Sequence, residues 1–151
     1  AIYQGAMRIY LDRFLNVPAA SRPNNVMPVD PARPEKLLEI MDKRQNVNEA
    51  AAWVIGYLHN QGSPERLVNQ LGHALLREDA DFHSFQLYEA AVVEYDYWSA
   101  RTDSFAERAR ETLLIAATRF LAAHAPTARE LSQTARIASR LYRGETLFEE
   151  E

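Results

Sequence analysis

The side chains best suited to chemistry fall in one segment, residues 72–89, which holds two of the four histidines of the chain. Asp79 and His83 lie four residues apart, so on a helix the carboxylate can hold one imidazole nitrogen and aim the other. His83 would then serve as a general base or a metal ligand, and we expect any ligand site to include it. His73 stands about 15 Å from it along a continuous helix, too far to share one metal ion unless the chain bends between them. The sequence therefore indicates a candidate metal site made of His83, Asp79 and His73.

Two glutamates of the same segment favour a structural role for these polar groups instead. Glu78 and Glu89 share one helix side, at about 100° per residue, with four large apolar residues. These are Leu71, Leu75, Phe82 and Phe85. An unpaired carboxylate in an apolar interior is costly, so we expect Glu78 or Glu89 to form a buried pair with an arginine of another helix. The candidate arginines are Arg119, Arg136 and Arg140. In this alternative Asp79 caps a helix, and both histidines are core groups with hydrogen bonds inside the protein.

Several well-known catalytic and cofactor motifs are absent from the chain. No histidine has a glutamate three residues before it, which excludes the Glu-x-x-His pairs of di-iron bundles. The zinc-protease, serine-hydrolase, phosphate-loop and dinucleotide motifs are missing too. Because cysteine is absent, the chain holds no disulfide, no thiolate nucleophile and no cysteine-ligated zinc or iron–sulfur cluster of its own. The sequence still allows one histidine to bind haem, and it still allows enzymatic activity. It identifies neither a cofactor nor a reaction.

The charge pattern limits the partners that the chain is expected to have. The net charge is −4 and the pI is near 5.6, with acidic and basic residues interspersed. No basic stripe emerges, so nucleic acid is not an expected partner. No apolar run reaches the roughly 18 residues that span a bilayer, and no signal peptide opens the chain, so we expect a cytoplasmic protein. A protein partner or a further domain of the same chain fits this composition.

Helix signals recur along the chain, whereas strand signals do not. Apolar residues repeat at spacings of three and four, and four N-terminal cap signals precede such repeats. These signals are Asn46 with Glu49, Ser63 with Pro64, Ser104 with Glu107, and Thr127 with Glu130. We therefore predict an all-α protein, an irregular bundle of six or seven helices. Asp79 or Asp81 is expected to start a helix that reaches Trp98, either after a break or past a kink in one continuous helix.

A proline-rich segment divides the first helix from the rest. Residues 17–34 hold five prolines, which is incompatible with a regular helix and predicts either an extended strap over the helices or a mobile linker. We predict a single helical domain over residues 1–148 and a frayed acidic tail over 149–151. Ala1 lies inside the first apolar repeat, so we expect part of a longer or processed chain. Abundant arginine and alanine are typical of a GC-rich bacterial genome.

Two smaller features concern packing. Gly56 and Gly72 lie inside predicted helices, where glycine costs about 1 kcal/mol, and they indicate close approach of a neighbouring helix. An aromatic cluster near the end of the helix that reaches Trp98 is typical of a core edge, and it also suits a pocket or a partner surface. Its members are Tyr88, Tyr95, Tyr97 and Trp98.

Two stretches of the chain resemble a known family. The strings YLDRFLNVP (residues 10–18) and LLREDADFH (residues 75–83) resemble the helical region of bacterial proteins described as Rieske-type iron–sulfur proteins of unassigned activity. The resemblance extends from the first helix to the turn at residues 125–127 and the last helix. It implies an oxidoreductase-associated domain. A Rieske centre needs two cysteines and two histidines, so the resemblance implies the helical part without the cluster domain. The resemblance implies that this helical part either docks to an electron-carrier protein or exists as a separate protein.

Two functions follow from these observations. In the first, the chain is the helical portion of a bacterial oxidoreductase-associated protein, with a buried polar or metal site around His73, Asp79 and His83 that opens on a cavity. In the second, it is a non-catalytic helical interaction or scaffold domain, and each buried carboxylate is matched by an arginine.

Overall fold

The computed structural model describes residues 2–12, 20–24 and 27–146, and every regular element within these ranges is an α-helix. The helices are α1 (Ile2–Asp12), α2 (Lys36–Met41), α3 (Val47–His59), α4 (Pro64–Arg77), α5 (Phe82–Ser99), α6 (Ser104–Ala123) and α7 (Glu130–Tyr142). The all-α prediction is confirmed. The acidic tail predicted at residues 149–151 and the start of the proline-rich segment, 17–19, lie outside the described residues. No helix in the described part is long and apolar enough to cross a bilayer.

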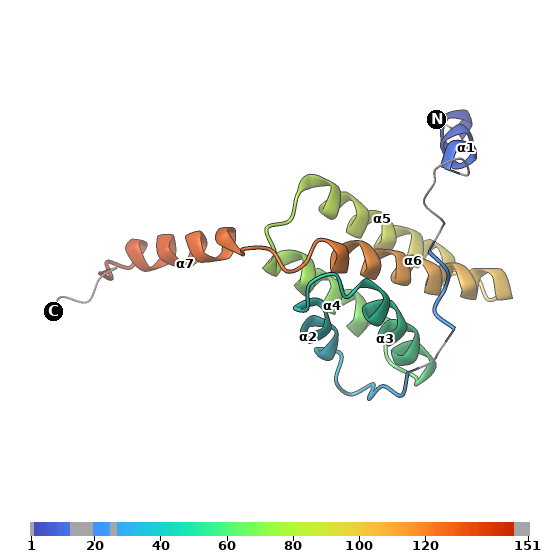
Figure 1. The fold of residues 1–151 in the computed structure, drawn as a ribbon, viewed down its shortest axis with the longest axis horizontal. Helices are drawn as coiled ribbons and strands as arrows, with labels where there is room; N and C mark the ends of the chain where they lie inside the picture. Colours follow the sequence, from blue (N-terminus) through green and yellow to red (C-terminus); the bar gives the residue numbers. More distant parts are fainter. Residues whose placement is uncertain (1, 13–19, 25–26, 147–151) are drawn as a thin grey trace.

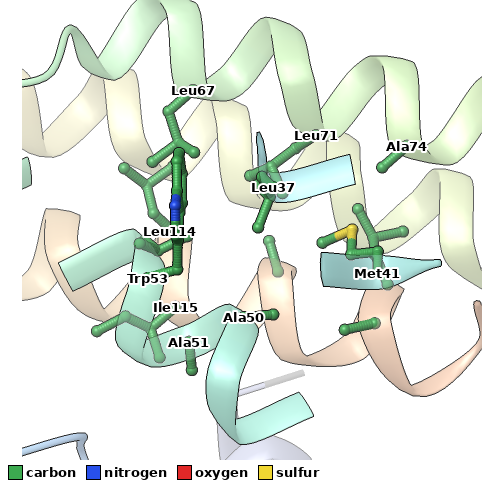
Figure 2. Packing of buried hydrophobic residues seen from close by; sticks show 14 of the residues in the cluster. Leu37, Met41, Ala50, Ala51, Trp53, Leu67, Leu71, Ala74, Leu114 and Ile115 are labelled. Atoms are coloured by element: carbon green, nitrogen blue, oxygen red, sulfur yellow. The ribbon is translucent and has the colours of Figure 1, made fainter. Parts of the chain in front are cut away.

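Helices α2 to α6 form the bundle, and α6 has its most extensive contacts with α5 and α3 (Figure 1). Figure 2 shows the core from close by, with Leu67 and Leu71 of α4 above Leu37 of α2 and Leu114 of α6. The largest fully buried side chains are Tyr57, Leu37, Met41, Leu67, Leu71 and Leu114. Burying a side chain of this size stabilises the fold by about 1.5–3 kcal/mol each, so α2, α3, α4 and α6 hold one another in place.

Side-chain caps fix where the central helices begin. Ser63 accepts a hydrogen bond from Arg66 N at 3.1 Å, with Pro64 in the first turn of α4, as the sequence predicts. Asp81 accepts from Ser84 N at 2.9 Å and starts α5. The backbone of Glu78 is extended, so α4 and α5 are separated by a break and do not form one kinked helix. The cap of α6 is Asp103, one residue before the predicted Ser104.

The described part of the proline-rich segment is an extended strap across the bundle. Arg119 of α6 donates hydrogen bonds to the carbonyl oxygens of Ala20 and Ser21, at 3.5 and 2.7 Å. Further along, a β-carbon at Gly56 would stand 2.5 Å from the carbonyl oxygen of Met27. The close approach predicted at this glycine therefore exists, but the strap makes it and not a helix. At Gly72 the close neighbour is the Tyr88 hydroxyl of α5, 2.9 Å from the position of a β-carbon.

Helices α1 and α7 lie outside the bundle. Figure 1 shows α7 continuing in the direction of α6, past the start of α5, and α1 standing apart at the other end of α6. No residue of α7 is buried, and the described side chains of α1 are all exposed. Both helices are amphipathic, and no described residue covers the apolar side of α7.

Candidate functional site

Three of the polar residues singled out in the sequence, Glu78, Asp79 and Thr127, meet where α7 leaves the bundle. The loop between α6 and α7 packs on the break between α4 and α5, and Glu78 lies at the centre of this contact. Its side chain is only 8 % exposed. The carboxylate accepts hydrogen bonds from Thr127 N at 2.7 Å and Thr127 Oγ1 at 2.8 Å. It also accepts two from the Arg129 guanidinium, at 3.1 Å from Nε and 2.7 Å from Nη2.

These donors keep Glu78 ionised. Burial raises the pKa of Glu78, but the hydrogen bonds from Arg129 and Thr127 outweigh burial and hold that pKa below its ordinary value. The same contact raises the pKa of Arg129, with Asp42 adding to the effect of Glu78. Both partners are therefore charged across the neutral pH range, and the pair is a true ion pair.

A second acid and a second arginine extend the pair into a network of four charges. Asp42, at the end of α2, pairs with Arg129 and lies 3.0 Å from Arg77 Nη2. Arg77 also donates to the carbonyl oxygen of Leu38 at 3.0 Å. Its Nε lies 3.1 Å from Glu78 Oε1, close enough for an ion pair although this nitrogen makes no hydrogen bond. The network joins the ends of α2 and α4 to the start of α7 with no net charge.

Asp79 caps α7. Its carboxylate accepts hydrogen bonds from Glu130 N at 2.8 Å and Leu131 N at 2.9 Å, the first free amides of that helix. Arg129, at the N-cap position, has a left-handed backbone with φ 57° and offers no side-chain cap of its own. The predicted capping box of Thr127 with Glu130 is therefore wrong, because the Thr127 hydroxyl bonds to Glu78. Asp79, 51 positions before Glu130, supplies the cap instead.

The three candidate metal ligands are not brought together. Both oxygens of Asp79 are engaged by the amides of α7. His83 is exposed on α5, where its Nδ1 lies 3.2 Å from Gln86 Oε1, and His73 is exposed on α4. Across the described ranges, no three histidine or carboxylate side chains are grouped so that they could hold a metal ion.

A buried glutamate–arginine pair exists at Glu78, but its partners are Arg129 and Arg77 and not the three arginines named from the sequence. Glu89 is exposed, because the break before α5 turns the side shared by Phe82, Phe85 and Glu89 toward solvent. The three proposed arginines are used elsewhere. Arg119 holds the strap, Arg136 bonds to the Ser132 carbonyl oxygen, and Arg140 pairs with Glu145.

A cavity of about 160 Å³ lies beside the network, between α4, α5 and the α6–α7 loop. Its wall is mostly apolar, and Glu78, Asp79 and Asp81 contribute its acidic groups. All three carboxylates already accept hydrogen bonds from protein donors. The acidic groups at this cavity are therefore matched by donors of the chain itself.

A second polar cluster, which the sequence does not indicate, lies at the strap. His59 Nε2 is 3.0 Å from Glu111 Oε1, and Arg22 of the strap pairs with the same carboxylate. A shallow groove of about 490 Å³ runs past them. His59 and Glu111 stand 52 residues apart on different helices, so no local spacing could have linked them. The contacts tie the strap to α3 and α6.

No protein-family model, no curated protein and no solved structure matches this chain at a significant level.

Proposed function

We propose that this chain is a helical protein-interaction domain that presents α7 to a protein partner, and that its buried ion pairs are structural. The observation that carries the proposal is that α7 has no buried residue, although its first turn is firmly bound to the bundle. A helix of 13 residues is marginal in water by itself. We therefore expect the apolar side of α7 to be buried against a protein partner.

The sequence of α7 is suited to such a contact. At about 100° per residue, Leu131, Ala138 and Leu141 fall on one side of the helix, and Arg136 and Arg140 fall on the other. Leu131 and Leu141 are 64 % and 54 % exposed. An amphipathic helix that lays its apolar side on a protein surface is a common mode of recognition.

The network at the α6–α7 junction gives the helix its direction. Glu78 holds Thr127 and Arg129 just before α7, and Asp79 holds its first two amides. A docking helix that is already oriented loses less conformational freedom when it binds, which favours affinity. Each buried carboxylate of the junction is matched by protein donors, as an interaction domain with structural ion pairs requires. The oxidoreductase-associated alternative rests on the family resemblance alone.

The native size of the chain in an extract of the producing cell tests this proposal. We expect it to elute as a complex, and Ile137→Ser with Leu141→Ser to shift it toward the monomer. The matched control is Ser132→Ala with Ser139→Ala, at least about 140° around α7 from both Ile137 and Leu141, which we expect to leave the complex intact. A monomeric wild-type chain, or equal behaviour of the two double variants, would contradict the proposal.

A further inference from the structure

An apolar groove of about 400 Å³ lies at the end of the bundle where α5 ends and α6 begins. Six residues line it. They are Trp98, Phe105, Arg108, Ala109, Thr112 and Leu113. Arg108, the one charged residue among them, is exposed, so an apolar occupant need not bury its charge. A groove with so few polar groups fits the apolar side of a helix better than a charged ligand.

The aromatic wall of this groove is already in place. The centre of the Trp98 ring lies 5.2 Å from that of Phe105, in an edge-to-face contact, and 4.9 Å from the guanidinium carbon of Arg101. Phe105 is nevertheless 65 % exposed. An occupant therefore buries the Phe105 ring without a rearrangement of Trp98, which favours binding.

We propose that the occupant of the groove is α1 of the same chain. This helix has 11 residues, a length that is marginal in water by itself. At about 100° per residue, Ile2, Ala6 and Ile9 fall within about 60° of one another and form its apolar side. Ile2 and Ile9 are 87 % and 71 % exposed. When α1 docks, this side is buried and the groove stabilises the helix.

The strap brings α1 to the correct side of α6. Arg119 donates hydrogen bonds to the carbonyl oxygens of Ala20 and Ser21, so the strap is fixed at that point. Arg119 lies about 20° around α6 and about 10 Å along it from Thr112 of the groove. Ala116, between them, is exposed on the same side. The groove therefore continues the surface on which the strap already lies.

The connection between α1 and the strap is long enough for this contact. Eight residue steps lead from Asp12 to Ala20, and an extended chain of that length spans up to about 28 Å. The far end of the groove, at Phe105, lies about 21 Å along α6 from Arg119. The groove extends about 12 Å from Phe105 to Leu113, and α1 is about 16 Å long, so α1 covers all of it. Figure 1 shows α1 apart from the bundle at this same end of α6.

The covalent link favours α1 of the same chain over α1 of another copy. A short tether holds a segment at an effective concentration in the millimolar range, so a second copy at micromolar concentration competes poorly. The inference does not depend on the proposed function, which concerns α7 alone, and the two are tested separately.

Disulfide trapping tests the inference, since the chain has no cysteine of its own. Ala6 lies near the middle of α1 and Ala109 near the middle of the groove, so the two meet whichever way α1 runs. We expect Ala6→Cys with Ala109→Cys to form a disulfide within one chain at least about tenfold faster than the matched control, Gln4→Cys with Ala109→Cys. Gln4 lies about 160° around α1 from Ala6, so this position faces away from the groove. Mobility on a non-reducing gel separates a bridge within one chain from a linked dimer.

Acrylamide quenching of tryptophan fluorescence gives a second readout, because Trp53 is buried and Trp98 lines the groove. Ile2→Ser with Ile9→Ser should release α1 and increase the quenching of Trp98, whereas Gln4→Ala should leave it unchanged. Equal trapping by the two cysteine pairs, or linked dimers in place of the bridge within one chain, would overturn the inference. Quenching that the two serine substitutions leave unchanged would overturn it as well.

Discussion

Glu78, directly after α4, accepts two hydrogen bonds from the guanidinium of Arg129, the residue directly before α7. The two residues stand 51 positions apart in the sequence. Their contact, together with Asp79, fixes a helix that otherwise lies outside the bundle. The following expectations test how much the fold and the direction of α7 depend on this junction.

Replacing Glu78 should cost considerable stability. Glu78→Gln removes the charge that holds Arg129 and Thr127, and we expect a loss of about 2–3 kcal/mol in the free energy of unfolding. The value stays below that of a fully buried pair because the Arg129 side chain is 33 % exposed. Urea unfolding gives the measurement. Glu89→Gln, at an exposed glutamate of α5, is the control and should change stability by about 0.5 kcal/mol or less. Equal effects of the two substitutions would contradict a buried role for Glu78.

The contribution of Glu78 should depend on pH with a defined sign. The folded pKa of Glu78 lies below its ordinary value of 4.5, so the unfolded state takes up its proton first as the pH falls. Glu78 therefore contributes its full stabilisation at pH values above its ordinary pKa. This contribution is lost as the pH falls through the folded pKa. We expect the stability difference between the wild type and Glu78→Gln to be constant from pH 6 to 7 and to shrink below about pH 4.5. A difference that grows in acid would show that the pKa is raised.

Removing the cap should loosen α7 and leave the bundle unchanged. Asp79→Ala leaves the amides of Glu130 and Leu131 without their acceptor, at a cost of about 1 kcal/mol to the helix. We expect faster hydrogen exchange throughout α7 and unchanged exchange in α3 and α6. Asp79→Asn keeps a side-chain oxygen and should behave nearly as the wild type. Faster exchange in α3 as well would mean that Asp79 supports the whole fold.

Two glycines of the helices should respond in opposite ways to the same substitution. A methyl group at Gly56 would stand 2.5 Å from the Met27 carbonyl oxygen, so Gly56→Ala must displace the strap and should destabilise the fold by about 1–3 kcal/mol. Gly5 of α1 has no heavy atom within 4 Å of the added carbon, so Gly5→Ala should only increase helix content. Thermal unfolding followed by circular dichroism measures both. A stable Gly56→Ala variant would show that the strap does not lie against α3.

The sequence predicts local features of this fold well, because caps and periodicity act within a few residues. Ser63 with Pro64 starts α4 as predicted, and Asp81 is one of the two residues proposed to start α5. The prediction that Phe82, Phe85 and Glu89 share a side also agrees with their common exposure. Whether that side faces the core or solvent depends on the angle at which α5 leaves the break, and no local pattern determines this angle.

Contacts between distant segments could not be predicted in the same way. No pattern in the sequence links Arg129 to Glu78, because the capping box of Thr127 with Glu130 predicts Arg129 in the first turn of a helix, whereas it directly precedes α7. Its left-handed backbone, with φ 57°, places its side chain at the junction, and nothing in its neighbours signals that conformation. The cap of α7 likewise comes from Asp79, far away in the sequence, whereas the local pattern favours Thr127.

Site-specific photo-cross-linking in the producing cell tests the central claim, that the apolar side of α7 is a protein-binding surface. A photo-reactive residue is placed at Leu141, on the apolar side, or at Ser132, about 180° away on the same helix. We expect Leu141 to give a cross-linked protein product and Ser132 to give little, and the mass of the product tells a second copy of the chain from another protein. Equal yields from the two positions, or no protein product from Leu141, would contradict the claim.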